Sequence, residues 1–390
     1  MSESPGVKNQ APTQNANFKQ KYFVFDQHRL IMFSNDDDFQ EKGILHIKNA
    51  RLKKTYLKDS KTKLFGFILM AKGQCIQFYS TDEEIIQTWI EKLKDTVILL
   101  DIKDEFLMGV LLGRGNFAKV HACTRKKDPE ETKYALKTIE KASIKKCKRN
   151  IQSVLQEIDI LRNLKHQYII KLHEVYESNK YIHLVLSYLD GGELFERIKS
   201  KQIYKESTAI TVMKNMLEAL AFMHKHKVVH RDLKPENLIL MSKDNDYDLR
   251  IADFGLATYV KPNEVLKLRC GSPGYVAPEI LEDVGYDEKS DIFSAGVIMC
   301  VLLTGRPVFR GYNLNEILVK NKKCEIDYPS KYWDKISAEA KSIVSLMLKK
   351  DPKERISAED ALKHKWFNQQ ENEINNVELD FAKGIEEDKN

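Results

Sequence analysis

Short apolar runs alternate with turn-forming residues over the first quarter of the chain, which is the pattern of β-strands. The runs are residues 21–25, 30–33, 43–47, 64–69 and 75–79. The first two flank Asp26-Gln27-His28 and predict a hairpin. After residue 80 the apolar period becomes that of a helix, which Ser80 or Thr81 would cap. The apolar positions of this helix are Ile85, Ile86, Trp89, Ile90 and Leu93. We therefore expect a small β-barrel or sandwich, capped by one helix, over residues 17–98.

The segments around this domain differ from it in composition. Residues 1–16 are rich in Asn, Gln, Ser and Pro without an apolar period, and we expect them to be disordered. Residues 99–105 are interpreted as a linker, and Phe106 begins a second, larger domain that extends to residue 367. Residues 368–390 form a short acidic tail, with more acids than bases.

Composition restricts the class of protein. A hydrophobic content of 42% and a charged content of 31% are typical of a soluble globular protein. No apolar run approaches the ~20 residues that span a bilayer, and the longest is Gly296–Leu303. The six cysteines include no CxxC pair, which favours free thiols in a reducing compartment such as the cytoplasm. A net charge of +6 does not by itself indicate nucleic acid, and we expect no such partner.

The second domain carries short motifs whose residue types suit phosphate and metal chemistry. They are Leu112–Val120 (LGRGNFAKV), Tyr134–Lys137 (YALK), His230–Asn237 (HRDLKPEN), Asp253–Gly255 (DFG) and Ala277–Glu279 (APE). Glycine lets a backbone hairpin approach a phosphate closely, where a Cβ would clash. Carboxylate and amide oxygens suit a hard cation such as Mg²⁺. In this order and spacing the motifs resemble those of the eukaryotic protein kinases, over residues 106–367.

This resemblance implies a fold, a reaction and a nucleotide site. The fold is α+β and bilobal, with a β-rich small lobe and a helical large lobe. The reaction is transfer of the γ-phosphate of ATP, with Mg²⁺, to Ser or Thr hydroxyls of protein substrates. Lys137 would hold the α- and β-phosphates, paired with Glu157, and backbone groups of residues 186–189 would bind adenine. Ala118 stands where the family has a third glycine. The whole nucleotide site would comprise Leu112, Gly113, Arg114, Gly115, Asn116, Phe117, Ala118, Lys119, Val120, Ala135, Lys137, Leu189, Glu193 and Ile239.

Four polar residues would carry the transfer itself. Asp232 would accept the proton of the substrate hydroxyl, and Lys234 would stabilise charge on the γ-phosphate. Asn237 and Asp253 would hold Mg²⁺. The structural alternatives are a turn aspartate, a surface lysine and a capping asparagine. Lys234 together with Ser272 resembles the serine/threonine branch of the family.

Two acidic residues bear on the choice of substrate. Glu193 and Glu236 match positions that contact ribose and basic substrate residues in related kinases. A preference for arginine upstream of the target hydroxyl follows from this match. The alternative is a pair of solvated glutamates at the mouth of a cleft.

Three further residues would support the large lobe. Glu279 and Arg355 resemble a buried ion pair that braces it. Asp291 would anchor the loop that carries Asp232.

Regulation is expected to depart from that of close relatives. Residues 270–279 resemble the calcium/calmodulin-dependent kinase group, but the acidic tail is no basic amphipathic helix, so we do not expect calmodulin to bind there. Leu268 stands where relatives often carry a phosphorylatable threonine, so activity should not need phosphorylation at that position. Arg231 could still pair with a phosphate on Thr258 or Tyr259.

The first domain has a family resemblance of its own. Lys21–Val24 (KYFV) and the late Trp89 resemble a pleckstrin-homology domain over residues 17–98. Residues 1–16 offer no first strand, where that family usually places a phosphate-binding lysine. A basic cluster either docks on anionic membrane lipid or is a solvated loop between strands. The cluster comprises Lys42, Lys48, Arg51, Lys53, Lys54, Lys58, Lys61 and Lys63.

Three functions are compatible with these residues. The first is an active serine/threonine kinase whose N-terminal domain targets or restrains it. The second is an adaptor built on an inactive kinase fold, and the third is a lipid-binding module that carries the kinase as a passenger. Substitution at Lys137, Asp232, Asn237 or Asp253 would have favoured the adaptor, and all four are intact. We therefore expect an active cytoplasmic kinase that membranes can recruit.

Overall fold

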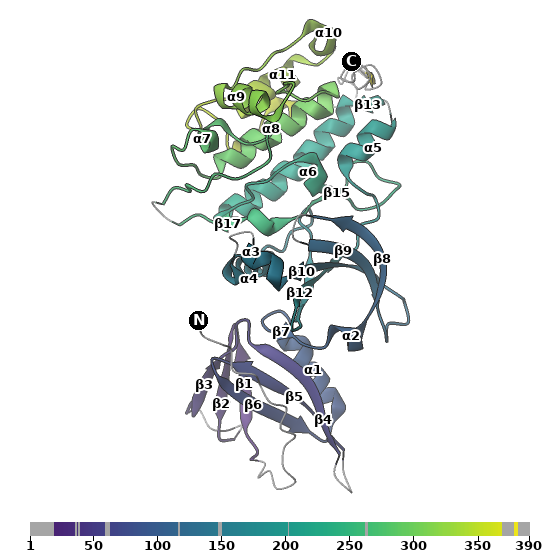
Figure 1. Cartoon of the computed structure of the whole chain (residues 1–390), viewed down its shortest axis with the longest axis vertical. Coiled ribbons are helices and arrows are strands. Elements are labelled where there is room, and N and C mark those ends of the chain that lie inside the picture. The colour runs from purple at the N-terminus through teal and green to yellow at the C-terminus, as the bar shows by residue number, and fades with distance from the viewer. Residues whose placement is uncertain are drawn as a thin grey trace. The chain divides into compact units, whose positions relative to one another are not determined.

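The structure is a computed structural model, described for residues 19–35, 37, 40–58, 63–115, 118–146, 150–201, 203–261, 264–368 and 378–380. The predicted disorder of residues 1–16 and the predicted site residues Asn116 and Phe117 lie outside these ranges. The chain divides into two compact units between Leu100 and Asp101 (Figure 1). No helix in the described part of the chain is long and apolar enough to cross a membrane.

The first unit packs two antiparallel sheets with one helix (Figure 1). One sheet contains β1 (Tyr22–Asp26), β2 (Arg29–Phe33) and β3 (Gly43–His46), and the other contains β4 (Arg51–Lys58), β5 (Lys63–Ala71) and β6 (Gln74–Ser80), with the short β7 (Ile98–Leu99) parallel to β4. The helix α1 (Glu83–Leu93) packs against β5 and β6. Phe67 is buried and stacks on Phe78, with ring centroids 4.7 Å apart. The predicted sandwich closed by one helix is confirmed.

The structure differs at two points from what the sequence suggested for this unit: the cap of its helix, and one of the two alternatives for the basic cluster. The cap of α1 is Asp82, whose Oδ1 accepts from the Glu84 N–H at 2.8 Å, because Asp82 is the last extended residue before the helix. Ser80 accepts from the Asp82 N–H instead, at 3.0 Å. The basic cluster is not a loop over residues 51–58, since these residues form β4 in continuous register with β5.

The second unit has a small lobe built on an antiparallel sheet with strand order β11-β12-β10-β9-β8. The short helix α2 (Ile102–Glu105) precedes it, within the predicted linker. The strands are β8 (Phe106–Arg114), β9 (Ala118–Arg125), β10 (Lys133–Glu140), β11 (Leu172–Glu177) and β12 (Tyr181–Ser187), and the helices are α3 (Lys141–Lys146) and α4 (Ile151–Asn163). Asn150 caps α4 by accepting from the Ser153 N–H at 2.9 Å.

The large lobe is helical, with α6 (Glu206–Lys225) and α8 (Lys289–Thr304) packed together at its centre (Figure 1). Every residue of α8 from Ser290 to Leu303 is buried, which accounts for the long apolar run in the sequence. A Cβ on Gly296 would lie 2.8 Å from a Leu348 methyl group, so glycine permits the close approach of α8 to α11 (Ala338–Met347). The predicted bilobal α+β fold is confirmed.

Shorter elements complete the large lobe. The strands are β13 (Ile203–Lys205), β14 (Val228–Val229), β15 (Leu238–Leu240), β16 (Leu249–Ile251), β17 (Thr258–Tyr259) and β18 (Glu378–Asp380), the last of which pairs with β13. The α-helices are α5 (Leu194–Lys201), α7 (Pro278–Leu281), α9 (Leu314–Lys323), α10 (Ser330–Trp333) and α12 (Ala358–Ala361). The 3-10 turns are η1 (Pro235–Asn237), η2 (Phe254–Leu256) and η3 (Lys365–Asn368).

Candidate active site

The hairpin of β8 and β9 contains the predicted glycine-rich loop. Gly113 lies opposite Val120, and the Gly115 N–H donates to the Ala118 carbonyl at 2.9 Å. A Cβ on Gly113 would meet no other atom within 4 Å, so the chain's own packing does not require glycine there. Space beside the backbone is what close approach of a phosphate needs. The other predicted loop residues in the described chain, Leu112, Arg114 and Lys119, belong to the same hairpin.

Lys137 on β10 connects the small lobe to the large lobe. Its Nζ lies 2.7 Å from Glu157 Oε1 on α4 and 2.7 Å from Asp253 Oδ1. Burial would lower the pKa of Lys137, but the two carboxylates raise it above its ordinary value. Lys137 in turn holds the pKa of Asp253 well below its usual range. Both side chains are therefore charged at neutral pH.

The loop His230–Asn237 is fixed by a buried carboxylate on α8. Asp291 accepts from the backbone N–H groups of His230 at 2.8 Å and Arg231 at 3.0 Å, and His224 Nε2 lies 3.1 Å from the same carboxylate. Burial alone would raise the pKa of Asp291, but hydrogen bonds and the nearby imidazoles lower it below its ordinary value. The predicted anchoring role of Asp291 is confirmed.

Asp232 lies at the centre of a short hydrogen-bonded cluster. Ser272 Oγ donates to its Oδ1 at 2.7 Å, and Lys234 Nζ lies 3.2 Å from its Oδ2. Lys234 also donates to Ser272 Oγ at 3.1 Å, and Asn237 Nδ2 donates to the Asp232 backbone carbonyl at 2.8 Å. These contacts hold a carboxylate, a cation and a hydroxyl within hydrogen-bond distance of one another.

Asn237 and Asp253, the predicted metal ligands, lie at the two ends of the β15–β16 hairpin. The Ala252 N–H donates to the Asn237 carbonyl at 2.8 Å, which brings these ends together. Asn237 donates a hydrogen bond through Nδ2, and Asp253 accepts one through Oδ1. The Asn237 side-chain oxygen and Asp253 Oδ2 could therefore serve as metal ligands. Oxygen donors are those that Mg²⁺ prefers, so the residues fit that ion.

The remaining predicted nucleotide contacts come from β10, the end of β12 and β15. Ala135 is buried and lies opposite Leu186 in the sheet. Glu193 forms an isolated bridge with Ile239 on β15, and Leu189 precedes it as a half-buried residue. Leu189 and Glu193 thus lie in the connection that follows β12, with Ala135 in the small lobe and Ile239 in the large lobe.

An acidic group lies beside this connection. Burial raises the pKa of Glu193 above its ordinary value, and the charges of Glu236 and Glu196 raise it further. Burial together with these two negative charges favours a cationic neighbour beside Glu193.

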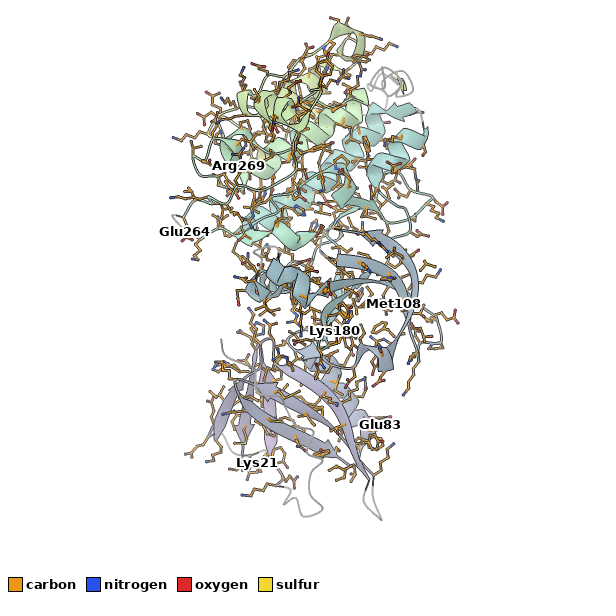
Figure 2. All side chains as sticks on the ribbon, in the orientation of Figure 1. Lys21, Glu83, Met108, Lys180, Glu264 and Arg269 are labelled. Carbon is orange, nitrogen blue, oxygen red and sulfur yellow. The ribbon has the colours of Figure 1, made fainter. Side chains whose placement is uncertain are left out.

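The segment between β17 and α7 runs along the outside of the large lobe, where Figure 2 shows Glu264 and Arg269. Leu268 within this segment is 60% exposed. A hydrophobic side chain at that position accepts no phosphate, which is the basis of the expectation that modification there is not needed.

Thr258 and Tyr259 contact the helix that carries Glu157. Gln156 Nε2 donates to Thr258 Oγ1 at 2.8 Å, and Asn163 Nδ2 donates to the Tyr259 hydroxyl at 3.1 Å. In this arrangement both hydroxyls bind α4. The Arg231 guanidinium instead donates to the Leu256 carbonyl and the Tyr286 hydroxyl.

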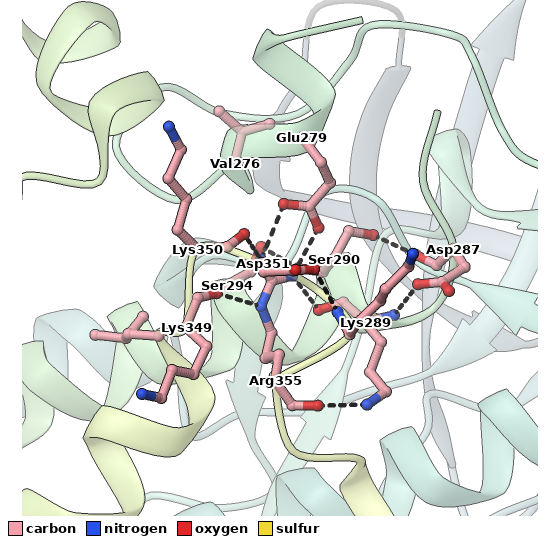
Figure 3. Close-up of polar contacts among 12 residues, drawn as sticks. Val276, Glu279, Asp287, Lys289, Ser290, Ser294, Lys349, Lys350, Asp351 and Arg355 are labelled. Atoms are coloured by element: carbon pink, nitrogen blue, oxygen red, sulfur yellow. Dashed lines mark hydrogen bonds and ion pairs between the residues drawn. The ribbon is translucent and has the colours of Figure 1, made fainter. Parts of the chain in front are cut away.

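Glu279 and Arg355 form the predicted buried ion pair (Figure 3). The guanidinium donates to both carboxylate oxygens, at 2.6 and 2.9 Å. It also donates to the carbonyls of Lys349, Lys289 and Lys350, at 2.9, 2.8 and 3.1 Å. A charge pair buried with all its donors satisfied is the arrangement that offsets its desolvation cost.

Some residues of the site carried no recognisable signal in the sequence. Gln156, His224 and Tyr286 belong to no motif, and each contacts the site through a side-chain hydrogen bond. Their positions depend on packing between segments far apart in the chain.

Two family models match the chain. The model described as "Protein kinase domain" matches residues 106–367, and the model described as "PH domain" matches residues 3–97. The second match begins within residues 1–16, ahead of the predicted start of that domain.

The curated relatives share the larger match. "Probable serine/threonine-protein kinase 2" of Plasmodium falciparum is 41% identical over 69% of this chain and 51% of its own length. "Myosin light chain kinase A" of Dictyostelium discoideum is 38% identical over 69% of this chain and 90% of its own. "Calcium/calmodulin-dependent protein kinase type 1" of Caenorhabditis elegans is 38% identical over 68% of this chain and 75% of its own. The chain thus spans about half the length of the first of these relatives.

Proposed function

This chain belongs to the protein kinase family, and from that premise we propose that it is an ATP-dependent serine/threonine protein kinase acting on protein substrates. The main support is the cluster around Asp232, in which Ser272 and Lys234 lie within 3.2 Å of its carboxylate oxygens. The Lys137 ion pairs, at 2.7 Å, support the same proposal.

We assign the proton transfer to Asp232. The substrate hydroxyl oxygen attacks the γ-phosphorus of ATP, its proton moves to the Asp232 carboxylate, and the bond from the γ-phosphorus to the β-phosphate oxygen breaks. Ser272 donates to Oδ1 and so orients the carboxylate, with Oδ2 on the side of Lys234. Lys234 stabilises the negative charge on the phosphoryl oxygens.

The nucleotide would lie between the β8–β9 hairpin and the lobe connection. Backbone groups of the hairpin would contact the phosphates, while Ala135, Leu189 and Ile239 would contact the base. Lys137 would bind the α- and β-phosphates. Asn237 and Asp253 would hold Mg²⁺, which supplies positive charge that neutralises the phosphate oxygens.

A preference for basic peptides follows from the acidic group at the lobe connection. We expect Glu236→Gln to lower kcat/KM about tenfold for a peptide with arginine upstream of its serine, because a charge-assisted pair is lost. The same substitution should leave a peptide with alanine at those positions unaffected. The measurement is γ-phosphate transfer to both peptides by parent and variant.

The control for this experiment is Glu339→Gln, which removes a carboxylate from α11 that pairs with Lys365. Equal effects of both substitutions on the arginine peptide would contradict the assigned contact. Failure of the parent to phosphorylate either peptide would contradict the proposed activity itself.

A second candidate function, docking of the first unit on anionic lipid, is favoured by a cavity of about 320 Å³. Its lining residues are His46, Lys48, Asn49, Ala50, Arg51, Met70, Ala71 and Lys72. Three of them are Lys or Arg and none is Asp or Glu, so the cavity suits a phosphorylated headgroup. We propose that this contact either recruits a cytoplasmic kinase to the membrane or releases it from inhibition by the first unit.

Charge reversal at Lys72, which directly follows β5, and at Lys63, which begins β5, tests the lipid proposal. Each charge near an anionic surface contributes about 1 kcal/mol. Lys72→Glu removes one cation and adds one anion, a change of about 2 kcal/mol, so vesicle binding should weaken about 30-fold. Lys63→Glu makes the same change at the far end of the strand and should weaken binding less. Sedimentation with phosphatidylserine and phosphoinositide vesicles measures both, with transfer assayed alongside. If Lys63→Glu has the larger effect, the cavity is not the docking site.

A further inference from the structure

One buried tyrosine connects the loop of Asp232 to the exposed segment around Leu268. Tyr286 lies between α7 and α8 and is 3% exposed. Its hydroxyl donates to the Leu268 carbonyl at 2.7 Å and accepts from Arg231 Nη1 at 3.4 Å. Burial raises the pKa of Tyr286 above its ordinary value, so the hydroxyl keeps its proton at neutral pH.

The backbone reinforces this connection. Leu266 and Tyr286 exchange both N–H to carbonyl hydrogen bonds, each at 2.9 Å. Gly285 has φ +86°, and a Cβ there would lie 2.9 Å from a Val265 methyl group. The segment 265–268 is therefore held against the Tyr286 loop by main-chain bonds, close contact and one side-chain hydroxyl.

Arg231 links the same hydroxyl to the reacting loop. Its Nε donates to the Leu256 carbonyl at 2.6 Å, its backbone N–H donates to Asp291, and it directly precedes Asp232. Its φ of +69° is unusual for a residue with a side chain and requires support from its neighbours. The Tyr286 hydroxyl is one such support.

We infer that Tyr286 is a positioning residue that holds the Leu268 segment and Arg231 in their working arrangement without any phosphate. This inference rests on the proposed kinase activity. Leu268 offers no hydroxyl to modify, and the guanidinium that could bind a phosphate already bonds two neutral oxygens. A neutral hydroxyl thus fills the place of a charged modification.

The test uses the full chain with Tyr286→Phe, after phosphatase treatment. Loss of the hydroxyl removes the hydrogen-bond partner of the Leu268 carbonyl and one partner of Arg231 Nη1. We therefore expect kcat to fall about tenfold. The KM for ATP should be unchanged, because the Lys137 contacts are untouched. Phosphatase treatment of the parent should leave its kcat unchanged. A fall in the parent's kcat after this treatment would overturn the inference.

Tyr176→Phe is the matched control. It removes an equally buried hydroxyl that donates to Glu174 at 2.9 Å within the small lobe. Both variants should lose similar thermal stability, but only Tyr286→Phe should lose kcat. Equal kcat values for Tyr286→Phe and the parent would overturn the inference, as would equal losses in both variants.

A double-mutant cycle with Arg231→Leu tests whether Tyr286 acts through Arg231. In that background Tyr286→Phe should change kcat by less than about twofold. Independent, multiplicative effects would overturn the inference. If the parent transfers no phosphate, the proposed function fails, but the contact between Tyr286 and the Leu268 segment can still be tested by trypsin cleavage after the exposed Lys267 and Arg269. Faster cleavage of Tyr286→Phe than of the parent supports this contact. Equal cleavage rates overturn it.

Discussion

Asp232→Asn is expected to lower kcat about 10³-fold, within the range found for removal of a general base. The amide keeps the shape of the carboxylate and still accepts from Ser272, but it no longer takes the proton of the attacking hydroxyl. Asp291 holds the loop through the backbone N–H groups of His230 and Arg231, and these two bonds do not involve the Asp232 carboxylate, so the melting temperature should change little. Initial rates of γ-phosphate transfer to a serine peptide, with saturating ATP, measure the effect.

Asp246→Asn makes the same chemical change in an aspartate that pairs with Arg197 at 2.8 Å, away from the proposed site. Its kcat should match that of the parent. An Asp232→Asn protein that phosphorylates peptide as fast as the parent would refute the role assigned to Asp232 and with it the transfer chemistry proposed here.

The parts of the site that could be predicted from the sequence are those fixed by local geometry. Asp232 and Asn237 are five residues apart in one loop, and the β15–β16 hairpin returns the chain to Asp253. Such short connections leave few possible arrangements, so the placement that the family resemblance implies for these residues depends little on long-range packing. The contact of Lys137 with Glu157 needed the family resemblance, because it depends on how α4 packs on the sheet.

The parts that could not be predicted depend on contacts between distant segments. Tyr286 reaches Leu268 and Arg231 across 18 and 55 residues of sequence, and a tyrosine ahead of a buried helix gives no sign of that partner. The strand β4 was missed for a different reason. Four of its eight residues are Lys or Arg, and Leu52 is the only buried residue among those whose burial is described, so the sequence does not show the alternation by which a strand is normally recognised.

Lys137→Met is expected to lower kcat/KM for ATP about 10²- to 10³-fold, the cost of removing one preorganised charge from a transition state. Methionine has a side chain of similar length and volume to lysine but lacks the cation that contacts Glu157 and Asp253. In the parent, ionisation of these two groups should not change kcat/KM for ATP between about pH 5 and pH 9. The lowered pKa of Asp253 keeps it ionised until the pH falls through that value, and the raised pKa of Lys137 keeps it charged until the pH rises through its own.

Lys141→Met is the matched control, because Lys141 follows the same strand and pairs with Glu177 at 2.6 Å without facing Asp253. It should retain the parent's kcat/KM for ATP. If Lys137→Met also retained it, the Lys137 ion pairs would only join the two lobes and would not act on ATP. Melting temperature and ATP affinity measured in the same variant separate the two roles. A lower melting temperature with unchanged ATP affinity indicates a purely structural ion pair. A lower ATP affinity indicates that Lys137 contacts the phosphates of ATP.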